Sequence, residues 1–316
     1  MPNDDDRPGD PGAPLRARRS RLHAWLELVR LPNLLTVPGD PIAGFLLAGA
    51  AGTEVAFIRV VPCAAASLFL YMAGTVSNDC FDLEEDLRDR PGRPLPSRRV
   101  HPGAALLVAV LLFALGVASA VLAGVVPAMV ACLLTLAVVT YNAGGKRITL
   151  WGPLNMGLCR GLSLMLGAAA LGVTGLTSTI VLVAAGGLTL YVAAVTLIAA
   201  KETSGKAVGT FTALLPSITM IPWMWAIILA APRFSVARGT WMWAAFLGSL
   251  LASTFVRGQT EPARISRGIG AFITILVLMQ AGLIALAPGE YSWLVSWSVF
   301  ALCPLSLWLG RKFYAS

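Results

Sequence analysis

Charged residues are scarce in this sequence. Asp, Glu, Lys and Arg make up 13% of its 316 residues, hydrophobic residues make up 57%, and the mean hydropathy is +0.75. A soluble domain carries about 25% charged residues, because its surface must be solvated. So few charges do not fit a water-soluble fold of this size. They fit a membrane, in which lipid-facing positions require apolar side chains.

Histidine clusters and paired cysteines are also missing. His23 and His101 stand alone, and the five cysteines show no close or metal-binding spacing. Four of the cysteines lie inside apolar runs, where they act as small hydrophobic residues. The sequence therefore indicates neither a His or Cys metal site nor a disulfide framework.

Long apolar runs dominate the chain instead. A membrane-spanning helix needs about 20 apolar residues, whereas barrel strands would show alternation in segments of about ten, which is not seen. We expect an all-α, polytopic transmembrane bundle with ten spans, at residues 33–53, 57–77, 103–122, 125–143, 154–174, 179–200, 209–231, 239–256, 269–287 and 291–310.

Basic residues divide unequally between the two sides of this topology. With the N-terminus in the cytosol, 21 of the 24 Lys and Arg residues lie on the cytosolic side, and only Arg59, Arg233 and Arg238 lie outside. The positive-inside rule requires such an asymmetry. It accounts for the net charge of +8 without a nucleic-acid partner and predicts an integral protein of the inner (plasma) membrane.

The N-terminal segment differs from the rest. Residues 1–21 are rich in Pro, Gly, Asp and Arg and have no apolar stretch, so we expect a disordered cytosolic tail and no signal peptide. Residues 22–316 are predicted to form a single transmembrane domain. Its longest polar connections, 84–102, 144–153 and 201–208, all fall on the cytosolic side, where we expect the chemistry.

An acidic segment, 77–89, ends the second predicted span. If the helix continues, 100° per residue places one amide and four carboxylates on one wall, with Asp79 at its edge: Asn78, Asp82, Glu85, Asp86 and Asp89. Like charges stacked along a helix are unfavourable, and Mg²⁺ prefers carboxylate and amide oxygens. The wall predicts a magnesium site. The alternative is a solvated loop that the five arginines of 88–99 neutralise.

Basic residues on the same side could hold a phosphate group. Candidates are Arg30, Arg93 and Lys146, although each could instead only set the topology. Tyr141 precedes Lys146 by about one helical turn and could face the same cavity. Arg160 is the one charge that we place deep in the membrane, so it requires a partner or a cavity.

These residues resemble the UbiA superfamily of intramembrane prenyltransferases. Asn78-Asp79-x-x-Asp82-x-x-x-Asp86 is similar to the first aspartate-rich motif of that superfamily. The segments 30–33, 93–97, 141–147 and 152–161 are similar to further family segments, in the same order. The resemblance covers residues 22 to about 206.

The resemblance implies about nine spans around a central cavity, with Mg²⁺ as cofactor. The implied reaction transfers a prenyl group from a prenyl diphosphate to a lipophilic, commonly aromatic acceptor within the membrane. Carried over to this chain, the implied residues are, for catalysis, Asn78, Asp79, Asp82 and Asp86; for the metal, Asn78, Asp82, Asp86 and Glu202; for the diphosphate, Arg30, Arg93, Lys146 and Lys201; and for the cavity, Asn33, Tyr141, Arg160 and Glu202.

The chain departs from the family at the second aspartate-rich motif. Residues 200–206 contain only Glu202 as an acid, beside Lys201, and a tenth span is a further departure. These features indicate a divergent member. They leave open an alternative function, a non-catalytic binder or carrier of a lipid or aromatic molecule on the same fold. Secondary transport is disfavoured because no inverted repeat is visible. The aspartate spacing of CDP-alcohol phosphotransferases is absent, and protein partners are left open.

Overall fold

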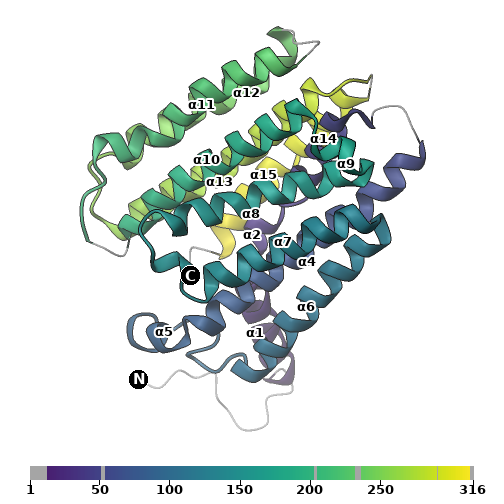
Figure 1. The fold of residues 1–316 in the computed structure, drawn as a ribbon. Helices are drawn as coiled ribbons and strands as arrows, with labels where there is room; N and C mark the ends of the chain where they lie inside the picture. Colours follow the sequence, from purple (N-terminus) through teal and green to yellow (C-terminus); the bar gives the residue numbers. More distant parts are fainter. Residues whose placement is uncertain (1–12, 51–53, 203–204, 232–235, 290, 314–316) are drawn as a thin grey trace.

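The computed structural model describes residues 13–50, 54–202, 205–231, 236–289 and 291–313. Within these ranges every regular element is a helix, and the long helices lie side by side in one bundle (Figure 1). The prediction of an all-α polytopic bundle is confirmed.

Eight helices in the described part of the chain are long and apolar enough to cross a membrane. They are α4 (Glu54–Phe81), α6 (Pro102–Ala123), α7 (Val125–Asn142), α8 (Trp151–Ala168, continued by η3, Ala169–Leu171), α10 (Thr179–Glu202), α11 (Thr210–Ala230), α12 (Val236–Val256) and α13 (Pro262–Leu286). Each coincides with an apolar run in the sequence, because only a helix satisfies every backbone hydrogen bond in lipid. The chain is therefore an integral membrane protein.

The first and last predicted spans are broken rather than continuous. The first consists of α2 (Leu31–Leu34), α3 (Gly39–Phe45) and the π-helical turn η1 (Leu46–Ala50). Pro38 separates α2 from α3, since proline cannot donate the hydrogen bond that a continuous helix needs. The last span divides into α14 (Ser292–Phe300) and α15 (Leu302–Phe313), because Pro304 cannot bond back to the carbonyl of Phe300. The expected nine to ten continuous spans thus become eight long helices and two broken segments in the described residues.

Four shorter elements complete the fold: α1 (Ala13–Leu28), α5 (Leu83–Asp89), η2 (Gly145–Arg147) and α9 (Val173–Leu176). Of the expected tail at 1–21, residues 1–12 lie outside the described part of the chain. Residues 13–21 differ from that expectation, because they form the first turns of α1.

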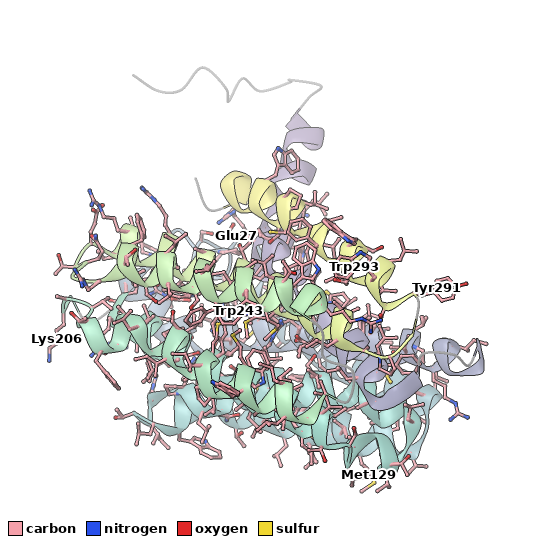
Figure 2. The ribbon with its side chains drawn as sticks, turned by 90° about the horizontal axis from the view of Figure 1, so that it is seen from above. Glu27, Met129, Lys206, Trp243, Tyr291 and Trp293 are labelled. Atoms are coloured by element: carbon pink, nitrogen blue, oxygen red, sulfur yellow. The ribbon has the colours of Figure 1, made fainter. Side chains whose placement is uncertain are left out.

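The helices connect alternately at two ends of the bundle. In Figure 1, α5 lies at one end and α9 and α14 lie at the other, while α6 and the α11–α12 pair form opposite edges. Figure 2 shows Lys206 and Tyr291, which belong to successive sets of connections, at opposite ends. The end that carries α5, η2 and the connections 205–209 and 257–261 is called the polar rim below. Two backbone hydrogen bonds, Val208 N to Gln259 O and Gly258 N to Val208 O, join its last two loops.

Close helix packing places the broken first segment inside the bundle. Gly44 on α3 faces the backbone carbonyl of Leu164 on α8, and Gly167 on α8 faces that of Pro41. Small residues allow such close backbone approach between membrane helices. This contact holds α3 against α8 and brings residues 33–40 to the wall of the cavity described next.

Candidate active site

A cavity of about 350 Å³ lies between α4, α7, α8, α10 and α13, beside the segment 30–37. Its size falls in the range of about 300–1,000 Å³ that small-molecule sites occupy. Most of its wall is apolar, and its polar lining includes four residues singled out from the sequence: Arg30, Asn33, Tyr141 and Arg160. Glu202, which was also expected to line the cavity, is not among the residues that form its wall.

Helix α4 shows how deep the cavity is. Its lining residues on this helix run from Ser67 to Asn78, eleven residues apart. At 1.5 Å per residue this corresponds to about 16 Å, measured from the polar rim into the membrane. The cavity therefore joins the acidic segment at the rim to the apolar interior.

The helix bends at Asp82 instead of continuing straight. Helix α4 ends at Phe81 and α5 begins at Leu83, with Asp82 at φ −91° and ψ 2° between them. Helical hydrogen bonds still cross the bend, from Asp82 N to Asn78 O at 3.0 Å and from Asp86 N to Asp82 O at 2.8 Å. The expected single acidic wall is thereby divided into two groups.

The first group joins Asn78, Asp82 and Lys146. The Asn78 amide donates to Asp82 Oδ2 at 3.0 Å, and Lys146 Nζ donates to Asn78 Oδ1 at 3.0 Å. Lys146 also forms an ion pair with Asp82 Oδ1. An amide and a carboxylate from α4 therefore hold a cation that comes from η2, as the sequence suggested when it placed Lys146 on the same side.

The second group joins Asp79, Asp86 and Arg93. Arg93 Nη1 donates to Asp86 Oδ2 at 2.7 Å and lies 3.7 Å from Asp79 Oδ1. Arg30 Nη2 approaches the same Asp79 oxygen at 3.9 Å. Both carboxylates are buried, and Asp79 Oδ1 has no hydrogen-bond partner.

The remaining acids of the segment face outward. Glu84, Glu85 and Asp89 are exposed, and Glu85 has only a 3.8 Å approach to Arg147, which is also exposed. For these three residues the solvated-loop interpretation describes the structure.

The second-motif region contributes less than the first. Lys201 and Glu202 are half-buried in the last turn of α10, and Glu202 lies within electrostatic range of Arg30, Arg90 and Arg93. In the described ranges, no three Asp, Glu, His or Cys side chains come close enough together to hold a metal ion. The predicted metal set of Asn78, Asp82, Asp86 and Glu202 is thus not assembled, because Lys146 and Arg93 already neutralise its carboxylates.

The donor chemistry nevertheless suits Mg²⁺. The Lys146 ammonium lies between an amide oxygen and a carboxylate oxygen, which are the ligand types of a hard cation. The buried, unpartnered Asp79 Oδ1 offers a further oxygen nearby. The residues therefore fit the ion, and magnesium binding stays a prediction.

Arg160 has a partner that sequence analysis missed. Its Nε lies 2.9 Å from Oδ2 of Asp40, which is completely buried on α3. Gln280 Nε2 donates to Asp40 Oδ1 and to Thr36 O, both at 2.6 Å. The expectation that Arg160 is the only deep charge is wrong. The signal was present, since Asp40 is an acid inside the first apolar run.

Asn142 on α7 is a second residue that the sequence did not single out. Its buried amide donates to Gly74 O at 3.0 Å and to Ser77 Oγ at 2.9 Å, both on α4. These bonds join α7 to α4 one turn before Lys146 and Asn78 meet. They fix the η2 cation against the acidic segment.

Comparison with known proteins identifies the family. The sequence model of the UbiA prenyltransferase family matches residues 41–316. The chain belongs to the UbiA prenyltransferase family. The match confirms the resemblance carried by the first motif and extends it to the C-terminal helices.

Individual relatives of this family member cover different parts of it. The digeranylgeranylglyceryl phosphate synthase of Sulfurisphaera tokodaii is 29% identical over 147 residues, which is 46% of this chain and 52% of the relative. The chain thus spans about half the length of the curated relatives that it matches. A solved digeranylgeranylglyceryl phosphate synthase has a TM-score of 0.56 at 19% identity, covering 83% of this chain and 97% of its own. A UbiA homologue from Aeropyrum pernix has a TM-score of 0.60 at 18% identity, covering 80% and 96%. At these identities the two structures show a shared fold.

Proposed function

We propose that this protein transfers a prenyl group from a prenyl diphosphate to a lipophilic acceptor within the membrane. The observation that carries the proposal is a largely apolar cavity that ends at clustered carboxylates, an amide and three cations on the polar rim. A prenyl diphosphate has the matching polarity, with an anionic head and an apolar chain. Family membership and the synthase relatives support the same reaction.

The cations have a direct role in this reaction. Breaking the allylic C–O bond builds negative charge on the departing diphosphate, and preorganised cations stabilise that charge. Lys146, Arg93 and Arg30 approach the acidic segment from three different elements, so they surround the position of the head group. Lys201, in the last turn of α10, is proposed as a fourth phosphate ligand.

Asn78, Asp82 and Asp86 would hold Mg²⁺, with Glu202 as the single acid of the second motif, and the bound ion would neutralise diphosphate charge as a Lewis acid. The protein side chains provide the rest of the environment. Apolar residues such as Leu134, Val138 and Phe272 line the cavity and exclude water from an allylic cation. Tyr141 lies in the same wall near the rim.

The proposal includes an orientation. Of the basic residues, 21 belong to the expected cytosolic side, which corresponds to the polar rim. We place the rim and the N-terminus in the cytosol, where diphosphate substrates and Mg²⁺ are available. Labelling of single cysteines at Lys206 and Tyr291 in intact cells tests this placement, because these residues lie at opposite ends of the molecule (Figure 2).

The reaction is tested with purified protein in nanodiscs. Labelled prenyl diphosphates of different lengths, Mg²⁺ and a panel of lipophilic acceptors are supplied, and diphosphate release and prenylated product are measured together. Asp82→Asn is expected to abolish both, whereas the exposed-site control Asp89→Asn is expected to retain them. Full turnover by Asp82→Asn would remove Asp82 from the proposed site.

A carrier function is the second candidate, and the altered second motif favours it. Only Glu202 is acidic there, and every buried carboxylate of the first motif already has a cation beside it. A carrier would bind prenyl diphosphate or an aromatic lipid without releasing diphosphate. Saturable binding with no release at any chain length would favour this function over transfer.

A further inference from the structure

A polar patch interrupts the apolar wall of the cavity below the rim. We call it the Arg160 patch, and it consists of Thr36, Ser67, Arg160 and Ser163, all of which line the cavity. Ser67 and Ser163 share a hydrogen bond of 2.7 Å, and Arg160 precedes Ser163 by about one turn of α8. Three separate elements, the α2–α3 connection, α4 and α8, therefore supply this patch.

The charge of the patch is balanced from behind. Arg160 Nε lies 2.9 Å from Asp40 Oδ2, and Asp40 is 0% exposed, so the carboxylate supports the guanidinium without itself reaching the cavity. Gln280 occupies the other Asp40 oxygen at 2.6 Å. In an apolar interior, charge is tolerated when it is paired in this way, and a second anion beside the pair would leave net negative charge there.

Hydrogen-bond donors nonetheless remain on the cavity side. A guanidinium has five N–H groups. Here one faces Asp40, and one donates from Nη2 to Thr36 O at 2.9 Å. Arg160 lines the cavity, and the two serine hydroxyls have one O–H between them beyond their mutual bond. The patch thus offers donors without net charge.

The rim end of the same cavity has the opposite character. There Arg30 and Lys146 are available for an anionic head group, as described above. Tyr71 lies between the two regions, seven residues from Asn78 on α4, and it is within electrostatic range of both Arg30 and Arg160. At 1.5 Å per residue the separation along α4 is about 10 Å. A molecule of one or two rings that is bound at the patch would therefore reach the allylic carbon of a diphosphate at the rim.

We propose that the Arg160 patch is the acceptor subsite, and that it selects a neutral acceptor with a carbonyl or un-ionised hydroxyl oxygen over an anionic one. This inference rests on the proposed transfer function. Asp40 is then the specificity-determining residue, although it does not contact the acceptor. It cancels the charge that would otherwise draw a carboxylate or phosphate to Arg160.

Two probes with the same apolar body test the selectivity. 4-Hexylphenol is neutral at pH 7 and 4-hexylbenzoate is anionic, and their dissociation constants are measured with the detergent-purified full chain. The wild type is expected to bind the phenol about tenfold or more tightly than the benzoate. In Asp40→Asn the preference is expected to reverse, because Arg160 then has an unbalanced charge. Arg147→Gln, at the exposed rim, is expected to leave both constants unchanged.

Arg160→Lys is the second variant, because it can keep the ion pair with Asp40 even if Asp40→Asn does not fold. It is expected to weaken phenol binding about tenfold, since the planar set of donors is lost, while benzoate binding stays weak. Equal binding of the two probes by the wild type, or an unchanged preference in both variants, would overturn the subsite. Absence of binding of either probe to the wild type would do the same.

Diphosphate release separates this inference from the proposed function. If the wild type releases diphosphate but shows no preference between the probes, the subsite is wrong and the transfer function stands. If the preference and its reversal are found without any release, transfer is wrong, and the patch is the selective site of a binder for neutral molecules.

Discussion

Lys146 donates a hydrogen bond of 3.0 Å to the side-chain oxygen of Asn78, which precedes it by 68 residues. The same ammonium pairs with Asp82, so one cation spans two residues of the acidic segment. Asn142 reinforces this arrangement by tying α7 to α4 just before η2. The site is thus held together across helices and not only along α4.

Replacing Lys146 with Gln is expected to lower kcat/KM for a prenyl diphosphate by about 10- to 100-fold. The physical reason is the loss of a charge-assisted contact worth about 1.5–3 kcal/mol with the departing diphosphate. Steady-state diphosphate release measures the effect. Arg147→Gln is the matched control, because Arg147 is adjacent in sequence but its side chain is 71% exposed. Equal losses in both variants would indicate that only general rim charge matters.

Removal of divalent ions is expected to abolish turnover, and Mg²⁺ is expected to restore it. A readout that does not depend on turnover is the binding of Mn²⁺, followed by its paramagnetic resonance signal in the purified protein with and without a non-hydrolysable prenyl diphosphate analogue. Asp82→Asn is expected to weaken this binding at least about tenfold, because a carboxylate ligand becomes a neutral amide. Asp89→Asn should bind Mn²⁺ like the wild type. Identical Mn²⁺ binding in the two variants would show that Asp82 is not a ligand.

The acidic segment shows how far helical periodicity reaches. With Asn78 at 0°, Asp82 lies at 40°, Asp86 at 80° and Asp79 at 100°. The structure pairs neighbours on this scale, Asn78 with Asp82 and Asp79 with Asp86 through Arg93. The division into two groups could therefore have been read from the sequence. Its cations could not, since their distances from α4 depend on how η2 and the loop after α5 fold back.

The membrane helices were predictable because apolar runs of about 20 residues have one stable structure in lipid. The first segment was harder to predict, because Pro38 and Pro41 interrupt an equally apolar run. Its irregular backbone is tolerated where protein surrounds it, against α8 and Gln280. The pairing of Asp40 with Arg160 joins residues 120 positions apart, so no local pattern reveals it.

Asp86→Asn is expected to destabilise the protein by about 1–3 kcal/mol. Asp86 is only 3% exposed and accepts a 2.7 Å hydrogen bond from Arg93, so the variant leaves a charged guanidinium with a neutral partner. Thermal unfolding in detergent measures the change. Glu84→Gln, an exposed acid on the same short helix, serves as control and is expected to unfold within about 0.5 kcal/mol of the wild type. A similar small shift for Asp86→Asn would mean that the buried pair adds little stability.

Two glycine-to-alanine substitutions test the packing that places the broken first segment beside the cavity. A Cβ on Gly167 would overlap the backbone carbonyl of Pro41, which cannot rotate away as a side chain could, so Gly167→Ala is expected to cost about 2 kcal/mol or more. Gly186 on α10 has open space where its Cβ would lie. Gly186→Ala is therefore expected to stabilise the protein by about 0.5–1 kcal/mol, because alanine favours a helix. Thermal unfolding of both variants measures the two effects. Because Pro41 adjoins Asp40, Gly167→Ala should also weaken 4-hexylphenol binding, whereas Gly186→Ala should not. Equal stability of the two variants would mean that α3 is not pressed against α8 at Pro41.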